Sequence, residues 1–355
     1  MKRFLMRRSL LGFAICLGLL PALTSCGSAP QTAGSDASAA LSQHASMDKP
    51  SEQLETVRVV LDWYPNAIHS FLYTARDQGF FKAEGIDLAI QFPANPNDAL
   101  TMPAAGKADI GLYYPADVLV AKIKENVPIQ VIGSVTQDPL SVMLSLKEKN
   151  IQTVDDLEGK TVGHASRPLD ELVLQTMTKS TGEKIQQYTM QDVGFDLLTA
   201  LTTGQVDVVA GCMVNHEVPV LKEKGFDVNI MYPTDHGVPA ISEMVLVTGE
   251  DHLKNKKDLY TRFLKACQKG FEAVQKDPEK ALDVLLENQE AEAFPLSRSV
   301  EKQSLDMLLP AMAKPGSPFL SQDKAAWQRT MEWLQAGGLI PKTIDPDELV
   351  VNLLP

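Results

Sequence analysis

The chain has 355 residues, a formal net charge of −12, 44% hydrophobic residues and 22% charged residues. Proteins that bind nucleic acid or an anionic membrane surface do so through basic patches, so an acidic chain argues against both, and we expect no nucleic-acid partner. The length leaves room for two domains, each with a core of its own.

The first 26 residues are predicted to be a lipoprotein signal peptide. Four basic residues fall within the first eight positions, and residues 9–23 are almost wholly apolar. Small residues then precede Cys26, an order typical of an export signal. The Leu-Thr-Ser-Cys ending resembles the bacterial lipoprotein signal, in which the cysteine becomes the lipidated N-terminus. An ordinary cleaved signal and an uncleaved membrane helix are the alternatives, although a span needs about 20 apolar residues.

Residues 27–56 are predicted to be a flexible tether. They are rich in Ala, Ser, Gln and Gly and hold almost no large apolar side chain, so burial cannot offset the entropy of ordering them. Because the signal holds four basic residues and no acidic one, its removal takes the formal net charge from −12 to −16. We expect an extracytoplasmic monomer anchored to the cell membrane by lipid on Cys26. The signal is compatible with export by either the Sec or the twin-arginine pathway.

Two cysteines remain outside the signal and its cleavage site. Cys212 and Cys267 have neither the spacing of a zinc cluster nor that of a CxxC redox site. The sequence is compatible with a single disulfide between them and with two buried free thiols. We therefore expect no metal site and no cofactor.

Strands and helices alternate from residue 57 onward. The expected strands of the first section are 57–63, 86–92, 108–114 and 129–135, and its helices are 71–81, the segment before Gly106, and 115–125. The pattern restarts after Asp155 with strand 160–165, helices 169–180 and 195–203, and strands 206–212 and 242–248. This order predicts parallel sheets covered by helices. From residue 253 the apolar spacing of three and four predicts amphipathic helices.

An internal echo predicts two similar lobes. In two segments about a hundred residues apart, a helix is expected to end at glycine and a strand to follow after aspartate, with Gly106 matching Gly204 and Asp109 matching Asp207. A generic helix-to-strand joint is the alternative. Two α/β lobes would place polar loops at their strand ends, facing a shared cleft.

Polar and aromatic residues gather at those expected strand ends. Trp63, Asn66 and His69 follow the first strand, and Trp63 or its neighbour Tyr64 could stack on a planar ligand. A core position for Trp63, and a helix-start or core position for His69, are the alternatives. Tyr113 and Tyr114 follow the third strand and add aromatic surface.

The second lobe offers two carboxylates. Glu217, with Asn215 close before it, could accept two hydrogen bonds from an amidine-like edge; a solvated carboxylate at a helix start is the alternative. Glu243 abuts an apolar strand, and burial there would require a hydrogen-bond partner.

Two stretches resemble the THI5/NMT1-like family. Residues 61–88, LDWYPNAIHSFLYTARDQGFFKAEGIDL, are similar to its opening pattern LDWxPNxxHxGxYxAxxxGxFxxxGI. Asn-His-Glu at 215–217 and HGVPAISEMVLV at 236–247 resemble second-lobe segments of its extracellular pyrimidine-binding, ThiY-type members. The chain departs from the family where Phe71 replaces a glycine and where His236 replaces a tyrosine.

The resemblance implies a type II periplasmic-binding-protein fold with two α/β lobes around a ligand cleft. Residues 57–139 and 245–355 would form the first lobe, and residues 140–244 the second. It also implies capture of a thiamin-precursor pyrimidine, such as N-formyl-4-amino-5-aminomethyl-2-methylpyrimidine, for an ABC permease. We expect ligand binding by Glu243 and by the seven residues that match the family: Trp63, Asn66, His69, Tyr113, Tyr114, Asn215 and Glu217.

Two rival functions come with the same fold. The family includes cytosolic pyrimidine synthases, but these use a cysteine-rich cluster in the second lobe, where this chain has only Cys212. A binding protein for an alkanesulfonate, nitrate or a riboflavin-like heterocycle is the other alternative. An anion would require cationic groups in the cleft, for which Arg167 is the one candidate. We therefore expect a binding protein and not an enzyme. The binding protein would close its two lobes on an aminopyrimidine that pairs with Glu217.

Overall fold

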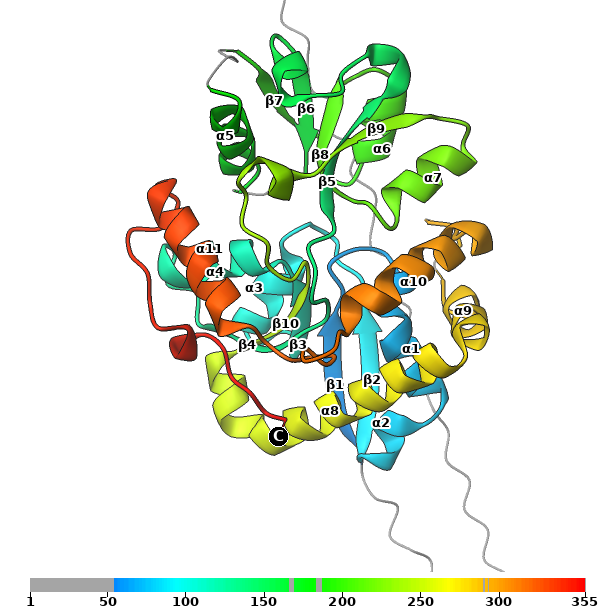
Figure 1. Ribbon diagram of the computed structural model, residues 1–355. Coiled ribbons are helices and arrows are strands. Elements are labelled where there is room, and N and C mark those ends of the chain that lie inside the picture. Colours follow the sequence, from blue (N-terminus) through cyan, green and yellow to red (C-terminus); the bar gives the residue numbers. More distant parts are fainter. Residues whose placement is uncertain (1–53, 166–168, 183–186, 290, 293, 355) are drawn as a thin grey trace, which may run out of the picture. The chain divides into compact units, whose positions relative to one another are not determined.

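The computed structural model describes residues 54–165, 169–182, 187–289, 291–292 and 294–354 (Figure 1). The predicted signal, Cys26 and Arg167 lie outside the described residues. The first strand begins at Glu55, two residues before its predicted start at Val57, because Glu55 pairs with Ile86 and its amide donates to the carbonyl of Gly85. In the part of the chain that is described, no helix is both long and apolar enough to cross a membrane.

The first sheet has five strands in the order β2-β1-β3-β10-β4. Their bounds are β1 Glu55–Val60, β2 Ile86–Gln91, β3 Ile110–Tyr113, β4 Ile129–Ser134 and β10 Val245–Gly249. β1 is parallel to β2 and β3, whereas β10 is antiparallel to β3 and β4.

The second sheet repeats this plan in the order β7-β6-β8-β5-β9. Its strands are β5 Ser141–Leu146, β6 Thr161–His164, β7 Thr189–Asp192, β8 Val208–Met213 and β9 Val228–Met231. β6 is parallel to β7 and β8, and β5 is antiparallel to β8 and β9.

The expectation of wholly parallel sheets is therefore wrong for one strand in each sheet. The chain passes from the first sheet to the second between Ser134 and Ser141, and returns between Met231 and Val245. The antiparallel strands, β5 and β10, are the ones that directly follow these two crossovers. A strand that enters from the other lobe starts at the end of the sheet that faces that lobe, so it runs opposite to the strands of the βαβ units.

Helices cover both faces of the first sheet (Figure 1). They are α1 Ser70–Asp77, α2 Phe80–Ala83, α3 Asp98–Ala104, α4 Pro115–Ile123, α8 Glu250–Lys276, α9 Pro278–Glu287, α10 Arg298–Met312 and α11 Lys324–Ala336. Alternate strand residues face opposite helix layers, as the period of two requires. Leu246 packs in the core with α1 and α8, whereas Val245 and Val247 pack in the core with α4 and α11.

The second sheet is covered by α5 Asp170–Ser180 on one face and by α6 Leu197–Thr202 and α7 Glu217–Glu223 on the other. Short 3₁₀ helices complete the fold: η1 Ala67–His69, η2 Lys147–Lys149, η3 Val154–Leu157, η4 Pro233–His236 and η5 Pro346–Glu348. We call the first sheet with its helices the first lobe, and the second sheet with its helices the second lobe. Cys212 and Cys267 are buried in different lobes and form no disulfide.

One close approach in the first lobe requires glycine. Gly270 of α8 faces α1, and a Cβ at this position would lie 2.3 Å from the carbonyl oxygen of Phe71. The missing side chain lets the two helices pack together. This packing fixes α1, and with it the turn between β1 and α1 that carries the first group of predicted site residues.

Candidate functional site

A cavity lies between the two lobes, at the ends of β1, β3 and β8. Residues of both lobes line it: Asp62, Trp63, Asn66, Pro96, Tyr114, Ala165, Leu197, Gly211, Met213, His216 and Glu217. Its polar groups come from the segments that directly follow β1, β3 and β8, as expected for an α/β protein whose ligand binds at the strand ends.

The turn after β1 is built around two buried polar side chains. The Oδ1 atom of Asn66 accepts a hydrogen bond from the amide of Ile68 at 3.1 Å, which caps η1. The amide of Asn66 donates to Nδ1 of His69 at 3.1 Å, so the proton of this ring lies on Nε2, which is 2.9 Å from Oδ1 of Asp62. The side chain of His69 is fully buried. His69 therefore orients Asp62 from behind the cavity.

Asp62 is the carboxylate of the first lobe at this cavity. It is 2% exposed, and its second oxygen, Oδ2, accepts a hydrogen bond from the hydroxyl of Tyr114 at 2.9 Å. Tyr113 points to the other face of β3, where its hydroxyl donates to Asn97 at 2.6 Å. The alternation of strand residues thus puts Tyr114 in the cavity wall and Tyr113 in the core.

Aromatic rings gather around Trp63, which lines the cavity. Trp63, from the first lobe, packs edge-on against Phe195 of the second lobe, with ring centroids 4.2 Å apart. Tyr64 stacks on Phe294 at 5.0 Å, with the two rings nearly parallel. Trp63, in the cavity lining, offers an aromatic surface suited to a planar ligand.

A bulge in β8 turns the chain toward the cavity. The pairing with β5 shifts register between Val142 and Leu144, and the extra residues on β8 include Gly211 in the left-handed region at φ 79°. Glu217 then starts α7, and its Oε2 accepts a hydrogen bond from the amide of Met213 at 2.7 Å. The carboxylate is 14% exposed and faces the cavity.

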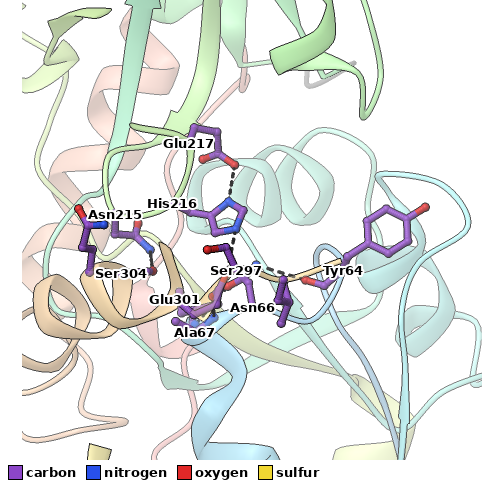
Figure 2. A network of polar contacts seen from close by, with 12 residues as sticks. Tyr64, Asn66, Ala67, Asn215, His216, Glu217, Ser297, Glu301 and Ser304 are labelled. Carbon is purple, nitrogen blue, oxygen red and sulfur yellow. Dashed lines mark hydrogen bonds and ion pairs between the residues drawn. The ribbon is translucent and has the colours of Figure 1, made fainter. Parts of the chain in front are cut away.

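His216 bridges this carboxylate to the first lobe (Figure 2). Its Nδ1 is 3.0 Å from Oε1 of Glu217, and its Nε2 is 3.4 Å from Oε1 of Glu301 on α10. Burial alone would lower the pKa of His216, but the two carboxylates outweigh burial and raise that pKa to about 10. His216 is therefore an imidazolium at neutral pH. Beside it, the side-chain amide of Asn215 donates to the hydroxyl of Ser304, also on α10, at 2.9 Å.

Glu243 ties the two crossovers together. Its Oε2 accepts from the amides of Leu140 and Ser141 at 2.8 and 2.7 Å, and its Oε1 accepts from the hydroxyl of Ser141 at 2.6 Å. The expected partner of this buried carboxylate is thus the start of β5. Glu243 lines a second, more apolar pocket next to the cavity, and the two pockets share Tyr114 and Gly211.

Sequence similarity shows which family this chain belongs to. The family model described as NMT1/THI5 like matches residues 66–281, more than half of the chain. The chain belongs to the NMT1/THI5-like family. The formylaminopyrimidine-binding protein of Halalkalibacterium halodurans is 41% identical over 285 residues, covering 80% of this chain and 86% of that protein. The 4-amino-5-hydroxymethyl-2-methylpyrimidine phosphate synthase THI5 of Saccharomyces cerevisiae is 27% identical over 237 residues, covering 64% and 69%.

Solved structures agree on the fold. The alkanesulfonate-binding protein SsuA of Xanthomonas axonopodis pv. citri matches with a TM-score of 0.66 at 17% identity, covering 84% of this chain and 98% of that one. At this identity the likeness speaks for the fold alone. The predicted two-lobe fold of periplasmic binding proteins is confirmed.

The structure divides the eight predicted ligand-binding residues into two groups. Four of them line the cavity: Trp63, Asn66, Tyr114 and Glu217. Glu243 lines the neighbouring pocket, and the other three lie behind the cavity wall, namely His69, Tyr113 and Asn215. These three side chains form hydrogen bonds with Asp62, Asn97 and Ser304, respectively. Their positions therefore favour a structural role over direct contact with a ligand.

Asp62, His216 and Gly211 are among the lining residues that the sequence did not predict. Asp62 stands at the end of the first strand within the motif, and that position was the available signal. His216 lies between the predicted site residues Asn215 and Glu217, but its charge depends on Glu301, 85 positions away in the sequence. Gly211 sits inside an expected strand, where an isolated glycine is a signal for a bulge.

The cavity can accept hydrogen bonds from a flat ligand. Two carboxylates, Asp62 and Glu217, line it from opposite lobes, and none of the described residues in its lining is Lys or Arg. Its one cation, His216, is already shared between two carboxylates. Across the described part of the chain, no three His, Cys, Asp or Glu side chains group in a way that could hold a metal ion.

Proposed function

We propose that this protein captures a thiamin-precursor aminopyrimidine, of the formylaminopyrimidine type, outside the cytoplasm and delivers it to an ABC permease. The observation that carries the proposal is Glu217, a partly exposed carboxylate in an inter-lobe cavity that Trp63 and several apolar side chains also line. A relative named for binding formylaminopyrimidine, 41% identical over most of both chains, supports the same ligand class.

The chemistry of an aminopyrimidine matches the lining. Its ring has two flat faces, which Trp63 and the neighbouring aromatic side chains can cover. Its exocyclic amine donates hydrogen bonds, and an adjacent ring nitrogen, when protonated, donates another. A carboxylate has about four lone-pair sites. In Glu217 two of these are taken by Met213 and His216, which leaves acceptor capacity directed at a ligand.

Titration calorimetry with the purified protein tests the proposal. The panel contains formylaminopyrimidine, its deformylated amine, thiamin and an alkanesulfonate. We expect the two precursor pyrimidines to bind and the sulfonate not to bind. Binding of the sulfonate alone would overturn the ligand class.

A sulfonate-binding function has less support here. An anionic ligand requires cationic groups or free amides around it. Neither the cavity nor the pocket beside it has Lys or Arg among the described lining residues. The two carboxylates in the cavity would repel an anion.

A synthase function is the second candidate, because the yeast relatives of the same family are pyrimidine phosphate synthases. Cys212 is the only cysteine of the described second lobe, and it is 1% exposed within the core of that lobe. We propose a binding protein and not an enzyme. Incubation with pyridoxal phosphate and iron, followed by a search for a pyrimidine product, tests this; product formation would overturn it.

A further inference from the structure

One imidazolium joins carboxylates of two different lobes. His216 and Glu217 belong to the second lobe, whereas Glu301 lies on α10 of the first lobe. The side chains of His216 and Glu301 are 5% and 1% exposed. Figure 2 shows the ring of His216 between the two carboxylates. We call these three residues the inter-lobe bridge.

The inter-lobe bridge continues into the turn that shapes the other wall of the cavity. The Oε2 atom of Glu301 accepts a hydrogen bond from the amide of Ala67 at 2.7 Å. Ala67 is the first residue of η1, the turn that Asn66 caps. A continuous chain of polar contacts therefore runs from Glu217 in the second-lobe wall to Asn66 in the first-lobe wall.

Two of these contacts cross the boundary between the lobes: the one between His216 and Glu301, and the one between Asn215 and Ser304. If the lobes separated, His216 would keep Glu217 but lose Glu301, and the bond between Asn215 and Ser304 would break as well. These contacts favour the closed arrangement where their attraction and hydrogen bonds exceed the cost of removing the charged groups from water.

We propose that His216 and Glu301 are positioning residues for Glu217: they favour closure of the lobes and hold the Oε1 atom of Glu217 in place, so that its remaining lone pairs point into the cavity. This inference rests on the proposed function, because Glu217 is taken as the acceptor for the ligand. It assigns to α10 of the first lobe a part in building a second-lobe binding residue.

The variant that tests the inference is Glu301→Gln. It keeps the shape of the side chain but removes the charge that His216 contacts across the boundary. Affinity measured for a protein that binds only when closed falls with the closed fraction. We expect about a 10- to 100-fold weaker affinity for formylaminopyrimidine, as is typical when one partner of a buried charged pair is neutralised.

The inter-lobe distance gives a readout that does not depend on the ligand. Spin labels at Lys224 and Gln303, both exposed and on opposite sides of the boundary, report it by pulsed electron resonance. We expect a larger closed fraction in the parent than in Glu301→Gln without ligand, and recovery of the short distance in the variant at saturating ligand.

Asp109→Asn is the matched control. Asp109 is a fully buried carboxylate of the first lobe, and its described partners, among them Arg58 and Lys256, all belong to that lobe. We expect this variant to lose stability but to keep the parental distance and affinity. If Glu301→Gln does not fold, Ser304→Ala removes one neutral bond across the same boundary and should shift the distances in the same direction.

The outcomes separate the two ideas. Parental distances together with parental affinity in Glu301→Gln would overturn the bridge. If formylaminopyrimidine binds neither the parent nor the variants, the proposed ligand is wrong, and the distances without ligand still decide whether the bridge favours closure.

Discussion

Glu217 is held from two directions before any ligand is considered. The amide of Met213 and the ring of His216 fix both of its oxygens. The sequence could predict an acidic residue at the second-lobe strand end, because the segment 215–217 follows an expected strand. It could not predict that Glu301 holds Glu217 in place through His216, because the sequence pattern does not define the bounds of the helix that carries Glu301.

Replacement of Glu217 tests its role as the acceptor. In Glu217→Gln one oxygen becomes an amide that faces the ligand's own donors. A charge-assisted hydrogen bond contributes about 1.5–3 kcal/mol, so calorimetry should show roughly 10- to 150-fold weaker binding of an aminopyrimidine. Glu148→Gln, an exposed carboxylate of the same lobe, is the control and should bind as the parent does. Parental affinity in Glu217→Gln would show that the acceptor lies elsewhere.

Trp63 tests whether the aromatic wall binds or only packs. Trp63→Ala removes a ring that contacts Phe195 across the lobes. We expect about a tenfold or greater loss of affinity with a small change in melting temperature. Phe263→Ala, in the first-lobe core, should instead lower stability by about 3–5 kcal/mol. A strongly lowered melting temperature with normal binding by Trp63→Ala would assign Trp63 to the core.

The charge on His216 predicts how stability depends on pH. The pKa of His216 is about 10 in the folded protein, above its usual 6.5. A raised folded-state pKa adds stability that is full below pH 6.5, decreases above it and is lost near pH 10. The total is up to about 5 kcal/mol, because a difference of one pKa unit corresponds to about 1.4 kcal/mol. Urea unfolding at pH 6, 8 and 10 should show a shallower decline in His216→Asn than in the parent; equal slopes would contradict the assignment.

At the scale of elements, the echo in the sequence is a real structural repeat. Gly106 and Gly204 both take the left-handed conformation, at φ 70° and 74°. Asp109 accepts from the amide of Arg58 on β1 at 2.9 Å, and Asp207 accepts from the amide of Thr161 on β6 at 3.0 Å. Each aspartate thus ties one helix-to-strand joint to the neighbouring parallel strand.

The two aspartates differ in burial, and this predicts unequal costs. The Asp109 side chain is fully buried and bonded to Lys256, whereas that of Asp207 is 30% exposed. Burial would raise the pKa of Asp109, but the bonds from Lys256 and Arg58 lower it below its usual value. Asp109→Asn should cost about 1–3 kcal/mol in unfolding free energy, and Asp207→Asn less than about 1. Equal costs in urea unfolding would contradict this difference.

Short elements limited what the pattern could predict. β7 and β9 have four residues each, half-buried for the most part, and too few positions to show a period of two. The expected helix 71–81 is two helices, because Gly79 adopts φ 75° between α1 and α2. The longer strands β1, β2 and β4 lie within three residues of their predicted bounds because each is a largely apolar run between turn signals.

At the scale of the whole molecule, the two lobes followed from the echo and the family motif, but the closing contacts did not. α10 was not predicted as a separate element, yet it carries Glu301 and Ser304 to the second lobe. α11 makes a second inter-lobe contact, in which the indole of Trp333 donates to Thr176 on α5 at 2.9 Å. Contacts between distant segments leave no local pattern, so only the folded chain reveals which helices meet the other lobe.

We predict that the molecule is attached to a membrane through Cys26, which lies outside the described residues. Leu-Thr-Ser-Cys at 23–26, after a basic and then apolar start, predicts lipid on Cys26. Expression in a bacterium with labelled palmitate should label the parent, and Cys26→Ser should take up no label. Cys212→Ser is the control, because its thiol is buried in the second-lobe core and should not affect labelling. Label retained in Cys26→Ser would show that the chain is anchored in another way, whereas loss of label with unchanged pyrimidine binding would separate the anchor from the ligand site.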